Sequence, residues 1–591
     1  MMKANVVKKN GKLQIGVGDS LLAPAAYMTY LDENGDFESF RRAGYKLFCV
    51  CVNMGDCSIN PNSDILPFAE HVWKARGKYD FTPVHRALKK AVGDGNSPVY
   101  VLLRLNVSAP LWWQEENPDE CIVYGDGLQG MQSVFSQRWK GDAKLFIDQL
   151  CTYLKEGAFS SNVIGLQIAA MHTEEWIAPR TPTGAYDYSL PARRAFAEYL
   201  EKKYGILDGL IPSQEALDAR LPQLHSTGVN LTEEYLRFYC EGYAEAICEF
   251  AAHAKRACGG EWLVGVFYGY IGQLGADQGH CAFKTVLECP NIDFFASPFA
   301  YNNARRGAFD WFYHGAMESC FAAGKLWFLE ADVRTWKTQP LYDTNPELMS
   351  GEKTVRYFKH PVFFGPETER ESLWVLLRSF AKVLISGNAF WWFDMWGGWY
   401  ASPAMMEMLS RMRALYERAF FDDGGKEYSA ELAVILNEEA SYLTPADVFR
   451  PLSYQQLSLL GFTGAPYVLY LAQDGESLAQ SNAKATLKIL CEKGENTLLY
   501  KDTVLAKKSA FTQQELTEHL RCAGVHIYSE GNIVYANTRF VALTATSEGM
   551  QTLTMPTECK LQAFTDGKIY EGKEFTFEMS INQTELFEVL E

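Results

Sequence analysis

The chain has 591 residues, and its 55 Lys and Arg against 72 Asp and Glu give a formal net charge of −17. This length corresponds to about three to five domains, or to one large barrel with smaller companions. With 48% hydrophobic and 21% charged residues, the composition is that of a globular protein and excludes long disorder. The acidic surplus argues against binding to nucleic acid or to an anionic membrane.

The sequence gives no sign of export, of membrane insertion or of a metal site. The N-terminus lacks the apolar core of a signal peptide, and no segment has the apolar length of a membrane span. The 14 Cys are scattered without a C-x-x-C motif, so we expect reduced thiols rather than disulfides or zinc. We therefore expect a cytoplasmic protein with no metal and no cofactor.

Short apolar runs alternate with amphipathic stretches through the first two-thirds of the chain. Strands are predicted over 24–30, 46–53, 99–106, 163–170, 263–268, 292–296, 326–329 and 389–393, and helices over 37–44, 83–91, 143–156, 191–204, 233–257 and 371–385. Eight strands with helical connections predict a (β/α)₈ TIM barrel over residues 1–428. The alternative, an open doubly wound sheet, requires a glycine-rich phosphate loop after the first strand, and LDENGDF after Tyr30 is not one.

Two smaller domains are predicted after the barrel. Residues 429–533 contain apolar runs at 431–437 and 467–472 and an amphipathic helix at 512–522, which indicates a small α/β domain. Residues 534–591 alternate apolar and polar side chains between turn signals such as Asp566-Gly567, which indicates a short C-terminal antiparallel β domain.

Acidic side chains follow several predicted barrel strands, at the end where a parallel barrel carries its active site. Strand four is followed by His172, Glu174 and Glu175, strand seven by Glu330, Asp332 and Arg334, and strand eight by Asp394 and Trp396. Two carboxylates facing each other across a sugar-sized gap can cleave a glycosidic bond. Aromatic residues make up 14% of the chain, and rings beside carboxylates suit sugars, whose C–H faces stack on them.

Structural roles remain open for most of these residues. Glu174 and Glu175 also suit a helix N-terminus, where carboxylates interact favourably with the helix dipole. Asp332 and Arg334 could form no more than an ion pair that steadies a loop. Glu330 is the most indicative, because an acid at the end of a buried strand is costly unless it is paired.

Four passages carry a resemblance to a known family. They are Gly77-Lys78-Tyr79-Asp80-Phe81 before a helix, VIGLQI at 163–168, IDFFASPFAY at 292–301 and FWWFDMWGGWY at 390–400. Through these passages the chain resembles the clan-A glycoside hydrolases, most closely the family-42 type of β-galactosidase and its less characterised relatives. In that clan the acid/base is a Glu that ends strand four and the nucleophile a Glu that ends strand seven. The resemblance thus implies Glu330 as the nucleophile and Glu174 or Glu175 as the acid/base.

The chain departs from the family in strand four. Family members carry an Asn-Glu pair soon after the Gly-x-Gln, whereas here Ala169-Ala170-Met171 stands in that place. Gln167 shares strand parity with Glu175 but not with Glu174, which favours Glu175 as the acid/base. The residues expected to bind the sugar are His172, Arg104, Tyr268, Tyr301, Asp332, Arg334, Trp392, Asp394 and Trp396.

The predicted function is that of a retaining, exo-acting β-glycosidase, similar to a β-galactosidase, that hydrolyses terminal sugars from β-linked oligosaccharides. The resemblance also implies that the α/β domain is similar to a glutamine-amidotransferase fold and that the protein is a homo-oligomer, with a trimer the first expectation. One alternative is a decayed hydrolase barrel that binds carbohydrate without cleaving it. Another is a metal-dependent hydrolase using His172, Glu174 and Asp332, which the low count of 10 His disfavours.

Overall fold

A closed barrel of eight parallel strands forms the centre of the molecule. The computed structural model describes residues 2–60, 62–94, 98–300, 307, 310–421, 430–475, 479, 481–492 and 495–590. The barrel strands are β4 (Ala25–Met28), β5 (Leu47–Asn53), β8 (Tyr100–Asn106), β11 (Val163–Ala169), β12 (Leu263–Phe267), β13 (Phe294–Pro298), β14 (Leu326–Ala331) and β15 (Ala389–Phe393). They confirm the predicted (β/α)₈ barrel, and their burial on both faces explains the continuous apolar runs.

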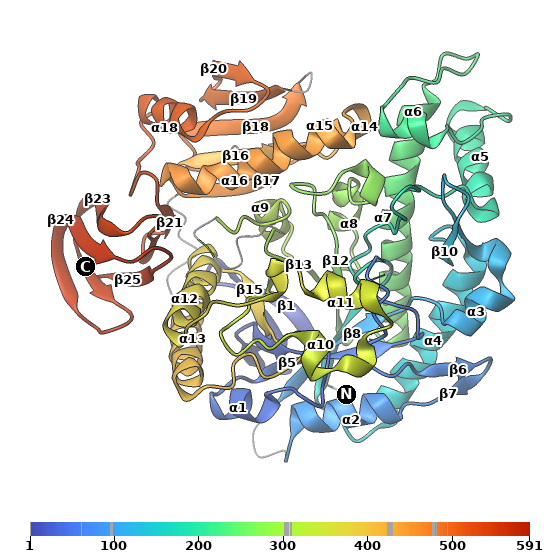
Figure 1. The fold of residues 1–591 in the computed structure, drawn as a ribbon, viewed down its shortest axis with the longest axis horizontal. Helices are drawn as coiled ribbons and strands as arrows, with labels where there is room; N and C mark the ends of the chain where they lie inside the picture. The colour runs from blue at the N-terminus through green and yellow to red at the C-terminus, as the bar shows by residue number, and fades with distance from the viewer. Residues whose placement is uncertain are drawn as a thin grey trace.

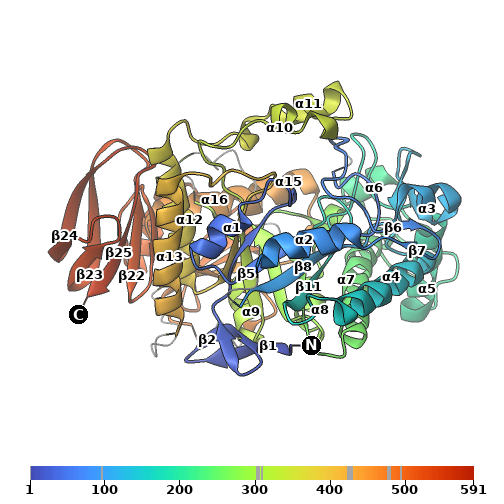
Figure 2. The ribbon, with the colours of Figure 1, turned by 90° about the horizontal axis from the view of Figure 1, so that it is seen from below.

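Helices on the outside of the barrel connect the strands (Figures 1 and 2). They include α1 (Phe37–Arg42), α2 (Thr82–Val92), α4 (Gln137–Glu156), α5 (Leu190–Tyr204), α7 (Leu231–Ala257), α12 (Glu369–Ser386) and α13 (Pro403–Phe421). The sequence predicted all of these except α13, and α4 begins six residues earlier than predicted because Ser136 caps it by accepting the backbone N–H of Trp139 at 3.0 Å. No helix within the described residues is long and apolar enough to cross a membrane.

A small N-terminal sheet, which the sequence did not predict, packs against the amino end of the barrel. It consists of β1 (Ala4–Lys9), β2 (Lys12–Val17) and β3 (Ser20–Leu22). Asn10 and Gly11 make the first turn with φ of 51° and 73°, the left-handed pair that a two-residue hairpin requires. The Ala4 N–H donates to the carbonyl of Glu261, just before β12, at 2.8 Å. Figure 2 shows this sheet on the side of the barrel away from α10 (Leu341–Thr344) and α11 (Glu352–Phe358).

Two further sheets follow the barrel, and they agree with the predicted fold class (Figure 1). The first has the order β17 (Tyr467–Leu471), β16 (Leu432–Leu436), β18 (Ala485–Glu492), β19 (Glu495–Tyr500) and β20 (Thr503–Lys508) and is accompanied by α18 (Gln513–Cys522). The second is antiparallel, in the order β21 (Ile533–Ala536), β22 (Phe540–Thr544), β25 (Thr584–Leu590), β23 (Gly549–Ala563) and β24 (Ile569–Met579). The predicted domain limits stay predictions, and the first of them falls at 428–429, outside the described residues.

A buried carboxylate joins the barrel to both smaller sheets. Asp310 is fully buried and accepts hydrogen bonds from Lys382 Nζ at 3.0 Å and from the Tyr535 hydroxyl at 3.0 Å. The Tyr467 hydroxyl donates to its other oxygen. Lys382 comes from α12, Tyr467 from β17 and Tyr535 from β21, so one side chain ties three parts of the fold together.

Candidate active site

A large cavity opens at the carboxyl ends of the barrel strands. Its volume is about 720 Å³, within the range of pockets that hold small organic ligands. The walls come from the loops after β4, β5, β11, β12, β14 and β15, from α11 and from α15 (Ala446–Arg450). The lining includes Tyr30, Phe68, Arg104, His172, Glu175, Glu330, Asp332, Arg334, Arg356, Phe358, Phe363, Phe393 and Arg450. Charged groups and aromatic rings therefore face the same hollow.

Glu330 ends β14 at the floor of this cavity. The register of β14 with β15 places it beside Trp391, whose Nε1 donates to Glu330 Oε2 at 3.0 Å. A guanidinium N–H of Arg104 donates to the same oxygen. Among the described residues none donates to Oε1, and 7% of the side chain is exposed toward the cavity. Oε1 is therefore the oxygen that a ligand can approach.

Arg104, at the end of β8, holds several groups of the cavity floor. It is buried, it donates to the Tyr30 hydroxyl at 2.9 Å, and its NH1 lies 4.0 Å from Glu174 Oε2. Burial alone would lower the pKa of Arg104, but Glu330 and the other acidic groups keep it well above its usual range. Burial raises the pKa of Glu330, and the Arg104 charge acts against this shift.

The loop after β11 has an unusual backbone. Met171, Thr173, Glu174 and Trp176 all adopt left-handed conformations, with φ between 54° and 66°. Such conformations cost non-glycine residues on the order of 1–3 kcal/mol each and cluster at functional sites. The irregular backbone directs Glu174 and Glu175, which are adjacent in sequence, to different surroundings.

Glu174 lies beneath the cavity rather than in its wall. Its side chain is 1% exposed, and Asn106 Nδ2 donates to its Oε1 at 3.3 Å. Burial raises the pKa of Glu174 to about 7, although Arg104 and the hydrogen bond from Asn106 act in the opposite direction. This carboxyl therefore titrates near neutral pH.

Glu175 lines the cavity together with Glu330. Its Oε2 accepts from the Thr173 hydroxyl at 2.6 Å, and its Oε1 accepts from the Tyr270 hydroxyl at 2.9 Å. Its backbone carbonyl lies 3.1 Å from Nε2 of His280. These contacts fix the Glu175 side chain in the wall formed by the loops after β11 and β12.

Four of the residues predicted to bind sugar line the cavity, Arg104 among them. The other three are His172, Asp332 and Arg334. Arg334 donates to the Asp332 carboxylate, so the ion pair considered from the sequence is present and lies inside the cavity wall. Burial and the charge of Arg180 lower the pKa of His172 to about 4, so this imidazole is neutral at pH 7. Tyr301 lies outside the described residues.

Four predicted sugar contacts do not line the cavity, and the structure corrects them. Tyr268 donates to the Gly279 carbonyl at 2.8 Å, Trp392 to the Tyr45 hydroxyl at 2.8 Å, and Trp396 to the Gln339 carbonyl at 3.0 Å. Asp394 accepts from the Tyr27 hydroxyl at 2.8 Å, and burial raises its pKa to about 7. All four are buried supports around the site. Side chains alternate along a strand, so Trp391 points inward and its neighbour Trp392 outward.

Several residues of the site were not singled out from the sequence. Tyr30 and Tyr270 contact Arg104 and Glu175, and Trp391 contacts Glu330. Tyr30 is the last residue of the first predicted strand, and this position could have identified it as a site residue. Trp391 is one of the residues of β15 whose side chains point into the barrel. Arg356 and Arg450 lie in helices that do not directly follow a barrel strand, so the search for polar residues at strand ends does not find them.

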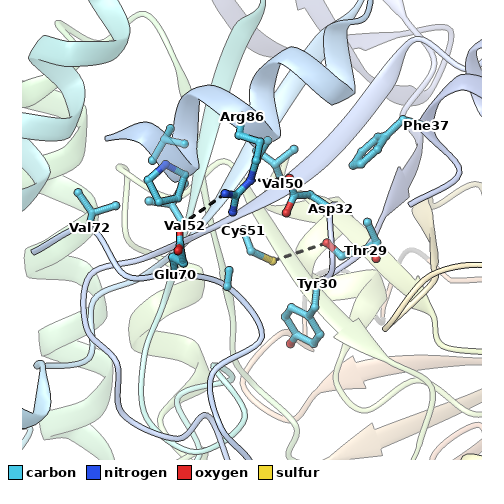
Figure 3. A pocket seen from close by; sticks show the side chains of 14 residues that line it. Thr29, Tyr30, Asp32, Phe37, Val50, Cys51, Val52, Glu70, Val72 and Arg86 are labelled. Atoms are coloured by element: carbon cyan, nitrogen blue, oxygen red, sulfur yellow. Dashed lines mark hydrogen bonds and ion pairs between the residues drawn. The ribbon is translucent and has the colours of Figure 1, made fainter. Parts of the chain in front are cut away.

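A second, much smaller hollow lies between β5 and α2 (Figure 3). Its volume is about 10 Å³, which leaves room for at most one water molecule. Arg86 spans it, lying 3.6 Å from the carboxylate of Asp32 and 3.5 Å from that of Glu70. This hollow is a packing gap rather than a ligand site.

The metal-dependent alternative receives no geometric support within the part of the chain that the structure describes. No group of three or more His, Cys, Asp and Glu side chains is arranged there to hold a metal ion. His172 and Asp332 line the cavity, whereas Glu174 lies beneath it.

Comparisons with known proteins give matches in structure only. No family model and no curated protein matches the chain. One matching structure is the β-galactosidase of Bacillus circulans sp. alkalophilus. Its superposition covers 96% of this chain and 98% of the β-galactosidase, with 12% sequence identity and a TM-score of 0.55. A catalytic mutant of Gan42B, a GH42 β-galactosidase from G. stearothermophilus, also matches. The superposition covers 96% of this chain and 98% of Gan42B, with 9% sequence identity and a TM-score of 0.54. For the apo GH42 exo-carrageenase of Bacteroides ovatus, the superposition covers 100% of this chain and 84% of the carrageenase, with 11% sequence identity and a TM-score of 0.54. The chain thus has the multi-domain barrel fold of the GH42 enzymes.

Proposed function

We propose that this protein is a retaining, exo-acting β-glycosidase that removes terminal sugars from β-linked oligosaccharides. The observation that carries the proposal is that Glu330, from β14, and Glu175, from the loop after β11, line one cavity of saccharide size. Oε1 of Glu330 is accessible there, while Arg104 and Trp391 hold Oε2. The match in fold to GH42 β-galactosidases supports the same reaction class.

In the first step Glu330 Oε1 attacks the anomeric carbon of the terminal sugar. The Arg104 charge and the Trp391 N–H favour the ionised carboxylate and orient it. Glu175 protonates the glycosidic oxygen as the bond breaks, which releases the rest of the oligosaccharide. A covalent glycosyl ester on Glu330 results.

In the second step Glu175, now ionised, removes a proton from a water molecule. The oxygen of that water attacks the anomeric carbon, the ester bond to Glu330 breaks, and the sugar leaves with its original configuration. Tyr270 and Thr173, which donate to Glu175, hold the carboxylate in place through both steps. A carboxyl separation of about 5 to 5.5 Å is the geometry that this double displacement uses.

Glu174 is the second candidate for the acid/base. Its pKa of about 7 suits a general acid at neutral pH, and it shares Arg104 with Glu330. Its carboxyl is nevertheless almost completely enclosed, with 1% exposure, and a general acid must reach the glycosidic oxygen. We therefore assign the role to Glu175 and give Glu174 the role of positioning Arg104.

The second candidate function is carbohydrate binding without hydrolysis. It is favoured by Ala169-Ala170-Met171, which replaces the Asn-Glu pair expected after the Gly-x-Gln of strand four.

A β-galactoside is the first substrate to test, because β-galactosidases are among the proteins with this fold.

A panel of nitrophenyl glycosides of both anomers tests the proposal. We expect hydrolysis of at least one β-glycoside with retention of configuration, and its loss in Glu330→Gln while that variant remains folded. Glu288→Gln, a carboxylate exposed on the outer surface, is the matched control and should retain activity. Sugar binding without turnover of any glycoside would favour the second candidate.

A further inference from the structure

Two exposed arginines stand at the mouth of the cavity. Arg356 comes from α11 and Arg450 is the last residue of α15. Both line the cavity and both are exposed. Within the described residues, neither guanidinium forms an ion pair or a hydrogen bond. An unpaired guanidinium offers several N–H donors in a fixed plane, which suits the two oxygens of an oxyanion.

The other cations of the cavity are already paired. Arg104 is bonded to Glu330 and Arg334 to Asp332, both at the buried end of the cavity. Lys353, at the mouth, lies 2.7 Å from a carboxylate oxygen of Asp64. The mouth therefore carries a local positive charge, although the chain as a whole has a formal charge of −17. A local excess of one sign of charge attracts ligands of the opposite sign.

The depth of these groups indicates which part of a substrate they face. Glu330 lies at the floor, with 7% of its side chain exposed, so the sugar that is cleaved must lie there. The remainder of the oligosaccharide must then extend outward between α11 and α15. The aromatic side chains of Tyr357, Phe358 and Phe363 line this route and suit the stacking of sugar rings.

We propose that the substrate carries an anionic group, a sulfate ester or a carboxylate, on the sugar that follows the cleaved bond, and that Arg356 and Arg450 bind it. This inference rests on the proposed glycosidase function and adds a substrate class to it. It also gives the second domain a part in the site, because α15 lies beyond the barrel and supplies Arg450. Sulfate and carboxylate share the oxyanion chemistry that the two arginines recognise.

The test compares three oligosaccharides that have the same terminal β-linked sugar. Their second sugar carries a sulfate ester, a carboxylate or no charge. We expect the wild-type kcat/KM to be at least about tenfold higher for one of the charged substrates than for the neutral one, which corresponds to about one charge-assisted hydrogen bond. The better of the two charged substrates identifies the source of the oxyanion.

Variants assign this preference to the two arginines. Arg356→Ala and Arg450→Ala should each lower the ratio of charged to neutral kcat/KM, and the double variant should bring it close to one. Lys359→Ala removes an exposed positive charge from the end of α11 that does not line the cavity, so the ratio should stay at the wild-type value. A purely structural defect would lower kcat/KM for all three substrates by the same factor and leave the ratio unchanged. Equal wild-type kcat/KM values for charged and neutral substrates would overturn the inference.

Binding separates this inference from the proposed function. Calorimetry with Glu330→Gln and the same three oligosaccharides measures affinity without turnover, and we expect tighter binding of a charged oligosaccharide that weakens at high salt. If no glycoside is hydrolysed but this preference exists, the hydrolase proposal fails and the anion site stands. If neutral glycosides are hydrolysed and no charged preference appears in either assay, the anion site alone fails.

Discussion

Arg104 and Glu330 are hydrogen-bonded to each other across the barrel, although β8 and β14 are opposite strands of its closed sheet. Four strand-to-strand steps separate them in either direction around the barrel, as the order β8, β11, β12, β13, β14 shows. The bond therefore exists only when the whole barrel has closed. The ionised state of the proposed nucleophile thus depends on the complete fold.

Replacement of Arg104 should change the pH dependence of activity. The Arg104 charge lowers the pKa of Glu330, so its removal in Arg104→Met raises that pKa. Because Glu330 must be ionised to attack, the acidic limb of the kcat/KM profile should move to higher pH, with a loss of about 10- to 100-fold at the optimum. Arg104→Lys keeps the charge and should show a smaller shift. An acidic limb that stays in place or moves to lower pH would show that Arg104 does not act on the nucleophile.

The assignment of the acid/base can be tested with leaving groups of different basicity. A dinitrophenolate leaves without protonation, whereas a sugar does not. Glu175→Gln should therefore lose much more activity on an oligosaccharide than on a dinitrophenyl glycoside. Glu174→Gln should lose similar factors on both, because Glu174 acts through Arg104. The opposite pattern would transfer the acid/base role to Glu174.

The buried Glu174 should make stability depend on pH. Its pKa is about 7 in the folded protein and ordinarily 4.5, so over this interval the folded state binds the proton more strongly than the unfolded state. Wild-type stability should then fall as pH rises from about 4.5 to about 7, by a few kcal/mol at about 1.4 kcal/mol per pKa unit.

Glu174→Gln removes this titration, so the variant should gain stability relative to wild type between pH 5 and pH 8. Urea denaturation at the two pH values measures the difference. Asp394 also titrates near pH 7, but it is present in both proteins and cancels. A difference that is the same at both pH values would mean that Glu174 does not titrate in this interval.

The carboxylate that joins the three sheets should be important for stability. Asp310→Ala leaves Lys382 buried without its partner, and the loss of one member of a buried ion pair costs about 3–5 kcal/mol. Thermal denaturation should show a clear decrease in Tm. Glu38→Ala, which breaks an exposed pair with Arg42, should cost less than about 1 kcal/mol. Equal effects of the two substitutions would contradict a joining role for Asp310.

The barrel could be predicted from the sequence because its strands are buried on both faces. A run such as Val163–Ala169 has no polar face and is followed directly by loop residues. The sequence therefore predicts both the strand and the position of its carboxyl end, where a barrel carries its active site. The N-terminal hairpin was not predicted although Asn10-Gly11 is a strong turn signal, because β1 is half polar and partly exposed and so lacks the continuous apolar run of the barrel strands.

The site could be predicted only in part, because the position of a residue after a strand does not fix the direction of its side chain. Glu175 and Glu330, which both follow predicted strands, line the same cavity, whereas on β15 the predicted Trp392 points outward and the inward residue is Trp391. The left-handed residues after β11 override strand parity, so the orientations of Glu174 and Glu175 required coordinates. Arg450 was out of reach because it joins the cavity from the second domain.

Covalent trapping tests the central claim most directly. The protein is incubated with a 2-deoxy-2-fluoro β-glycoside that carries a dinitrophenyl leaving group, since the fluorine slows the hydrolysis of the glycosyl ester more than its formation. Mass spectrometry of the digested protein then locates the label. We predict one added glycosyl group, on the peptide that contains Glu330 and at that residue. A label on any other carboxylate, or turnover with inverted configuration and no label, would contradict the account.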